Sequence, residues 1–139
     1  MKPIMQTAFR DPDGRDRGNC LAAALASVME VEIDTVPHFV QLEENGGRYW
    51  WDAMQAWLAE RNLWMVSVPR CDVIYPGPTE PPFLLASGVS PRDPDGRTKH
   101  MVVYRSGRIV HDPHPDGTGL VGDREMWGFY ALARLDPSR

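Results

Sequence analysis

Apolar residues follow two different patterns in the first half of the chain. From Cys20 to Met29 they occupy nearly every position, which predicts a helix buried on almost all of its faces. From Tyr49 to Arg61 they recur every three or four positions, which predicts a second long helix with one apolar face. Residues 33–39 are expected to form a short helical turn with a kink at Pro37, and residues 43–47 a loop. The apolar face of the second helix is formed by Trp50, Met54, Trp57 and Leu58.

Runs rich in β-branched and aromatic residues dominate the second half of the chain and predict strands. The proline-rich residues 76–82 are expected to form a rigid connector. Helices followed mostly by strands are typical of the α+β class, in which helices pack on an antiparallel sheet. With 139 residues and no break in composition, the chain is expected to form a single domain over residues 1–139. The strand-like runs are residues 63–68, 83–88, 101–104, 108–111 and 127–135.

The hairpin over residues 101–111 predicts a specific pairing of polar residues. Residues 105–107 suit a three-residue loop, in which a type I turn is followed by a left-handed residue, here Gly107. In that register His100 falls directly opposite Asp112 on one face of the hairpin, close enough for a hydrogen bond. A two-residue turn would shift the pairing by one residue and place the two side chains on opposite faces.

The position of Cys20 indicates nucleophilic chemistry. A thiol in the first turn of a helix lies beside unpaired backbone N–H groups and the positive end of the helix dipole, which stabilise the thiolate. Taken alone, such a cysteine is more often a small buried core residue. A histidine that holds the proton and an acid that orients the histidine change this interpretation, and His100 and Asp112 supply both. We therefore expect a Cys-His-Asp site.

Charge and composition narrow the classes of partner. The net charge is -4, and lysine and arginine are scattered along the chain, so no basic stripe for nucleic acid is present. Residues 1–6 lack the apolar core of a signal peptide, and no apolar stretch is long enough to span a membrane. The expected location is the cytoplasm. The oligomeric state is left open.

The two cysteines of the chain are expected to have different roles. Two thiols do not make a disulfide framework for a chain of this length, although a single bridge is left open. Cys71 precedes no helix-like apolar run, and it is interpreted as an ordinary structural thiol.

Four sequence segments carry a resemblance to a known family. They are Gln6, Gly18-Asn19-Cys20 at the start of a buried helix, Lys99-His100-Met101-Val102-Val103, and Val110-His111-Asp112-Pro113. This arrangement resembles the papain-like cysteine peptidases, most closely the bacteriocin-processing branch that cleaves double-glycine leaders and its small bacterial and phage relatives.

The resemblance implies both a fold and a set of roles. The fold is papain-like, with the nucleophile at the start of the central helix and an antiparallel sheet following it. Cys20 is then the nucleophile, His100 its proton acceptor, Asp112 the residue that orients His100, and Gln6 a donor of the oxyanion hole. No cofactor is implied.

The expected activity is hydrolysis of a peptide, isopeptide or carboxamide bond through an acyl-enzyme, with a peptide or protein as substrate. Deamidation and transfer to an amine use the same constellation and stay open. Asn19, Trp51 and Trp64 are the expected substrate contacts, and residues 90–98, next to His100, are expected to form the rim of the cleft.

Two alternatives belong to other functional classes. One is a papain-like fold that has lost turnover and acts as a binding or inhibitory module through its exposed aromatic residues. The other is a metal-binding protein, because four potential ligands lie within a proline-stiffened segment of residues 111–116. The potential ligands are His111, Asp112, His114 and Asp116.

Overall fold

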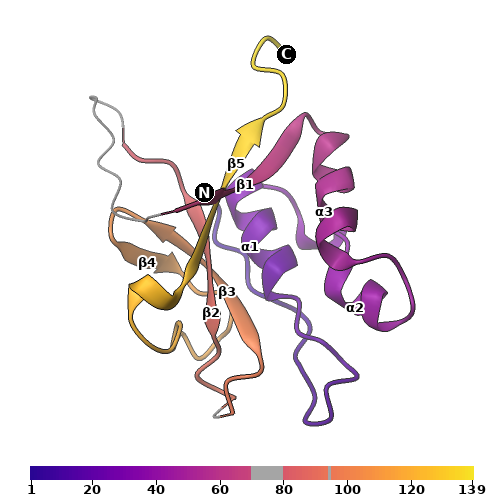
Figure 1. Cartoon of the computed structure of the whole chain (residues 1–139), viewed down its shortest axis with the longest axis vertical. Coiled ribbons are helices and arrows are strands. Elements are labelled where there is room, and N and C mark those ends of the chain that lie inside the picture. Colours follow the sequence, from indigo (N-terminus) through magenta and orange to yellow (C-terminus); the bar gives the residue numbers. More distant parts are fainter. Residues whose placement is uncertain (70–79, 94) are drawn as a thin grey trace.

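A computed structural model describes residues 1–69, 80–93 and 95–139, and within these residues three α-helices precede five strands (Figure 1). All strand pairs are antiparallel, and the strands lie in the order β1-β5-β2-β3-β4. The fold is therefore α+β. The helices are α1 (Cys20–Met29), α2 (Phe39–Glu44) and α3 (Trp50–Ala59), and the strands are β1 (Leu63–Val68), β2 (Leu84–Val89), β3 (Lys99–Arg105), β4 (Arg108–His111) and β5 (Gly128–Arg134).

Most predicted elements are confirmed, and the helix α2 is the main addition. The helix predicted over residues 20–29 has the same bounds in the structure, and the second long helix is shorter by one residue at its start and two at its end. The expected loop over residues 43–47 is wrong in its first two residues, because they complete α2. Tertiary contacts explain this helix, since Phe39 is buried against Trp57 with ring centroids 5.9 Å apart.

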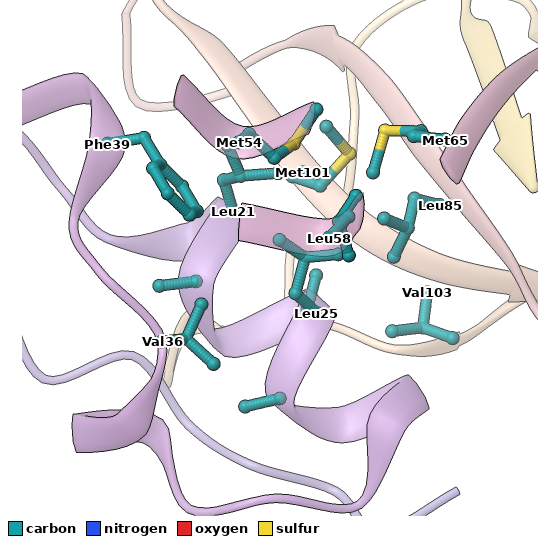
Figure 2. Packing of buried hydrophobic residues seen from close by; sticks show 13 residues of the cluster. Leu21, Leu25, Val36, Phe39, Met54, Leu58, Met65, Leu85, Met101 and Val103 are labelled. Atoms are coloured by element: carbon teal, nitrogen blue, oxygen red, sulfur yellow. The ribbon is translucent and has the colours of Figure 1, made fainter. Parts of the chain in front are cut away.

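The main hydrophobic core lies between the helices and one face of the sheet (Figure 2). Leu25 from α1 and Leu58 from α3 are fully buried and meet Leu85 and Val103 from the sheet. Burying a side chain of this kind stabilises the fold by about 1.5–3 kcal/mol. The near-continuous apolar character of residues 20–29 is explained because α1 packs against β3 and shares one buried cluster with residues of α2 and α3.

A second, smaller core covers the opposite face of the sheet. Alternate residues of β2 and β3 point into it, and Trp127 packs against it. The two central strands are thus buried on both faces. The buried members of this cluster are Leu84, Ala86, Val102, Tyr104 and Phe129.

The side chain of Gln55 joins α3 to the edge strand β1. Its Nε2 atom donates to the carbonyl oxygen of Met65 at 2.8 Å, and its Oε1 atom accepts from the backbone N–H of Met65 at 2.9 Å. Gln55 and Met65 are both buried. The amide therefore satisfies two backbone groups that the edge strand would otherwise leave unpaired.

Residues 2–8 run alongside α1 in an extended segment that is tied down on both sides. The backbone N–H of Ile4 donates to Ser27 Oγ at 2.9 Å, and its carbonyl oxygen accepts from His111 Nε2 at 2.8 Å. Further along, the N–H of Gln6 donates to the carbonyl oxygen of Pro113 at 3.0 Å. This segment brings Gln6 to the start of α1.

The loop between β3 and β4 differs from the prediction. Arg105 pairs with Arg108, so the turn has two residues, Ser106 and Gly107, with φ of 53° and 83°. The expected three-residue loop is wrong, because both residues adopt the left-handed conformation of a type I′ turn. The register then shifts between Tyr104 and Val103, where β4 carries one extra residue as a β-bulge.

Candidate active site

Cys20 is the first residue of α1 and its half-buried thiol is free. It opens into a cavity of about 870 Å³ whose wall is built from the N-terminal segment, all three helices and strands β2, β3 and β5. The first turn of α1 contains no acidic residue, so nothing on the helix itself offsets the positive end of its dipole.

His100 and Asp112 form a buried hydrogen-bonded pair. The Nε2 atom of His100 lies 2.7 Å from Asp112 Oδ1, and the side chains are 3% and 7% exposed. Two backbone N–H groups hold the carboxylate in place, from His114 to Oδ1 at 2.9 Å and from Gly119 to Oδ2 at 2.8 Å. Burial raises the pKa of Asp112, but these hydrogen bonds outweigh it and the pKa lies below its ordinary value.

Cys20 contacts the same imidazole. Burial lowers the pKa of His100, whereas hydrogen bonds and charge interactions with Asp112 and Cys20 raise it, and the pKa reaches about 9. The ring is therefore protonated at neutral pH. Because Nε2 is bonded to Asp112, Nδ1 is the ring nitrogen available to the sulfur of Cys20. The structure thus brings Cys20, His100 and Asp112 together as the sequence predicts.

Gln6 lies in the wall of the same cavity and is 8% exposed. Its Nε2 atom donates to the carbonyl oxygen of Ala8 at 3.0 Å, which fixes the orientation of the amide. Its Oε1 atom is buried without a hydrogen-bond partner among the described residues. A polar atom of this kind is costly unless a ligand or water meets it.

Gly18 makes room for Gln6. A Cβ atom at position 18 would lie 3.3 Å from Gln6 Nε2 and 3.5 Å from the backbone nitrogen of Arg10. This close approach is the physical reason for glycine two residues before the cysteine. The sequence assigns no separate role to Gly18, because the contact joins segments twelve residues apart.

Asn19 holds the N-terminal segment against α1. Its Oδ1 atom accepts from the backbone N–H groups of Thr7 and Ala8, each at 2.9 Å, and its Nδ2 atom donates to Thr7 Oγ1 at 2.9 Å. The side chain is buried and is not part of the cavity wall. In the free protein its polar atoms are engaged in positioning the segment that carries Gln6, rather than directed to the cavity where a substrate contact was expected.

The two expected aromatic contacts lie in different places. Trp51 lines the cavity beside Tyr130, with ring centroids 5.7 Å apart. Trp64 is 40% exposed on β1 and borders a separate depression that Trp51 also lines. The structure therefore places Trp51 at the site and Trp64 outside it.

The cluster of potential metal ligands over residues 111–116 does not converge. His111 is turned to the carbonyl oxygen of Ile4, Asp112 to His100, and His114 Nδ1 lies 3.0 Å from Asp116 Oδ1. Over the described part of the chain, no group of three or more His, Cys, Asp and Glu side chains is arranged to hold a metal ion.

His114 is a further residue of the site that the sequence did not single out for it. Its ring lies edge-on to His100 with centroids 6.3 Å apart, and it lines the cavity. The expected rim, residues 90–98, also borders the cavity through several side chains. Cys71, predicted to be a structural thiol, lies outside the described residues.

No protein-family model, curated protein or solved structure matches this chain. Among the helices within the described residues, none has the length and apolar character needed to cross a bilayer. The assignment of function therefore depends on the geometry of the site.

Proposed function

We propose that the chain is a papain-like cysteine hydrolase that cleaves a peptide, isopeptide or carboxamide bond. The observation that carries this proposal is the contact of a free helix-start thiol with a buried imidazole that is itself bonded to a carboxylate. This geometry suits a nucleophile, a proton carrier and an orienting acid. The adjacent cavity leaves space for a substrate.

The first half-reaction forms an acyl-enzyme. The sulfur of Cys20 attacks the carbonyl carbon, and the developing negative charge on oxygen is stabilised by the backbone N–H of Cys20 and the amide N–H of Gln6. His100 then gives its proton to the leaving nitrogen, the C–N bond breaks, and the amine departs. Asp112 keeps the ring oriented and stabilises its positive charge during the approach.

The second half-reaction releases the product. A water molecule gives a proton to the now neutral His100 and attacks the thioester carbon. The C–S bond breaks, the carboxylic acid departs, and the thiolate and imidazolium are restored. Hydrolysis of a backbone amide releases a peptide amine, whereas hydrolysis of a glutamine side chain releases ammonia, so the released nitrogen compound distinguishes the two reactions.

Thiol labelling provides the first test. Iodoacetamide is added at pH 6, where an ordinary thiol with a pKa of about 8.5 is almost entirely protonated and slow. We expect Cys20 to be alkylated at least tenfold faster than Cys71, and this advantage to be lost in His100→Ala. Peptide mass spectrometry measures both thiols in the same sample, so Cys71 is the internal reference.

Acylation by 4-nitrophenyl acetate tests the next step. We expect a burst of 4-nitrophenolate and an acetyl group on Cys20 in the unaltered protein, and neither in Cys20→Ala. Equal alkylation of the two thiols at pH 6 together with no burst would overturn the proposal. That outcome would favour the binding or inhibitory module in its place.

A further inference from the structure

The charge of the cavity wall is opposite to that of the whole protein. The chain carries a net charge of -4, yet five arginine and lysine side chains line the cavity against three aspartate and glutamate side chains. A cleft whose wall carries charge of one sign raises the local concentration of ligands that carry the opposite charge. The cations are Arg10, Arg17, Arg92, Arg97 and Lys99, and the acids are Glu43, Glu44 and Asp93.

Three of the cations are partly or wholly balanced by acids. Arg17 Nη1 lies 3.7 Å from Glu44, and Arg92 Nη1 lies 2.9 Å from both carboxylate oxygens of Asp116. Arg10 interacts electrostatically with Asp93.

The acidic residues of the wall are also engaged within the protein. Besides the pairing of Glu44 with Arg17, Glu43 accepts a hydrogen bond from the backbone N–H of Trp50 at 3.3 Å. Asp93 accepts from the backbone N–H of Thr98 at 2.8 Å.

Arg97 and Lys99 are the remaining cations. Both side chains are exposed at the cavity, and in the part of the chain that the structure describes neither makes a salt bridge or a side-chain hydrogen bond. They flank Thr98, whose carbonyl oxygen accepts from the N–H of Ser90 at 2.9 Å. Lys99 directly precedes His100, and consecutive Cα atoms are about 3.8 Å apart. The two charges therefore lie on the segment that leads into the reacting pair.

We propose that Arg97 and Lys99 form a subsite for a substrate carboxylate close to the bond that Cys20 attacks. This inference rests on the proposed function and names its substrate class: a peptide or protein segment with an acidic side chain, or a chain-terminal carboxylate, within a few residues of the scissile carbonyl. The guanidinium of Arg97 suits two-point binding of a carboxylate, and the ammonium of Lys99 adds a point charge. The acidic remainder of the surface disfavours binding of such a segment elsewhere.

Charged alkylating peptides test the subsite through Cys20 itself. The probes are chloroacetyl-Gly-Glu-amide, chloroacetyl-Gly-Gln-amide, chloroacetyl-Gly-Lys-amide and the free acid chloroacetyl-Gly-Gln. In each reaction the sulfur of Cys20 forms a bond to the methylene carbon and chloride leaves. The second-order rate of labelling at Cys20 is measured by peptide mass spectrometry at low and high salt.

For the unaltered protein at low salt, we expect the Glu probe to react roughly tenfold faster than the Gln probe, and the Lys probe to be the slowest. Salt should bring the three rates together, because it screens exposed charges. Arg97→Gln/Lys99→Gln should reduce the advantage of the Glu probe several-fold. Faster labelling by the free acid, in place of the Glu probe, would assign the subsite to a chain terminus.

A matched control removes the same charge elsewhere. Arg108→Gln/Arg134→Gln alters two cations outside the cavity wall and should keep the full preference for the Glu probe. The subsite proposal would be overturned if both double variants lost the preference for the Glu probe equally, or if Arg97→Gln/Lys99→Gln kept it in full. Either result would leave the assignment of Cys20 as the nucleophile unaffected. Failure of every probe and of iodoacetamide to label Cys20 faster than Cys71 would overturn the proposed function and the subsite with it.

Discussion

His100 Nε2 lies 2.7 Å from Asp112 Oδ1 because two irregularities of one hairpin together shift its pairing by two residues, which keeps both side chains on one face although they are not directly opposite as predicted. The two-residue turn shifts the pairing by one residue and by itself would place the two side chains on opposite faces. The extra residue of the β-bulge, between the pairs Tyr104–Ile109 and Val103–His111, shifts the pairing by one more. Asp112 then falls on the face of His100.

Asp112→Asn is expected to reduce the acylation rate by roughly 10²–10⁴-fold without abolishing it. The amide keeps the size of the carboxylate, but it removes the negative charge that stabilises the protonated ring of His100. In addition, the N–H groups of His114 and Gly119 each require an acceptor, which an amide nitrogen does not provide. The rate of 4-nitrophenolate release measures the effect.

Asp123→Asn is the matched control for this substitution, because Asp123 is exposed and lies outside the cavity wall. It is expected to retain the full rate. An Asp112→Asn protein as fast as this control would show that the carboxylate has no role in orienting His100.

The sequence predicts the structure best where the residues of the site lie in helices and strands with a clear local pattern. The helix at Cys20 follows from a nearly continuous apolar run, and the strands follow from their β-branched content. The pairing of His100 with Asp112 is also predicted, but through a three-residue loop that does not form. The correct pair thus results from a wrong register, because turn residues alone do not report a bulge farther along the strand.

Other features of the site depend on contacts between distant segments and leave no local signal. The close approach of Gly18 to Gln6 is one, and the pairing of Asn19 with Thr7 is another. Trp64 illustrates the reverse case, since its aromatic ring suggests a binding role but strand β1 places it outside the cavity. The face of the sheet on which a single strand residue lies depends on how its strand pairs with strands that are distant in sequence.

The stability of the protein is expected to fall as the pH rises from about 6.5 through 9. The pKa of His100 is raised to about 9 in the folded chain, so the folded state retains a proton that the unfolded state has released. This contribution is fully present below pH 6.5 and is lost above the folded pKa. Urea unfolding at pH 6.5, 8 and 10 should show a loss of roughly 1–3 kcal/mol that is absent in His100→Gln.

Cys20→Ala provides the control for the origin of this shift. Removing the sulfur takes away one of the two partners that raise the pKa of His100, so the ring should titrate at a lower pH. Proton NMR of the imidazole measures the change directly. An unchanged titration curve in Cys20→Ala would show that the thiol and the imidazole do not interact.

The turn at Ser106 and Gly107 is expected to respond in opposite directions to two substitutions. Ser106 has φ of 53°, a conformation in which asparagine is favoured, so Ser106→Asn should raise the free energy of unfolding by about 0.5 kcal/mol. Gly107 has φ of 83°, and Gly107→Ala should lower it by about 1 kcal/mol. Thermal melts check both, and a lower Tm for Ser106→Asn would contradict the type I′ turn.

Gln55→Met is expected to destabilise the protein by about 2–4 kcal/mol. Methionine is similar in length but meets neither the N–H nor the carbonyl oxygen of Met65, and both groups would be left buried without a partner. Denaturant unfolding measures the loss. Asp52→Asn, on the exposed face of the same helix, should cost less than about 1 kcal/mol, because it removes only the interaction of one exposed carboxylate with the start of α3.

Gly18→Ala is expected to slow acylation by roughly tenfold while leaving alkylation of Cys20 unchanged. The added Cβ would lie 3.3 Å from Gln6 Nε2, so the amide must move by a few tenths of an ångström. In the proposed mechanism acylation develops an oxyanion to which this N–H donates, and a small displacement of such a donor is costly. Alkylation by iodoacetamide forms no oxyanion and reports only on Cys20 and His100.

Gln6→Ala completes the test as a double-mutant cycle with Gly18→Ala. Gln6→Ala alone should slow acylation by about 10²–10³-fold, the usual effect of removing one oxyanion donor. In that background Gly18→Ala should add little, because the side chain that it displaces is already absent. Additive losses, or slower alkylation in Gly18→Ala, would show that Gly18 acts on the start of α1 and not through Gln6.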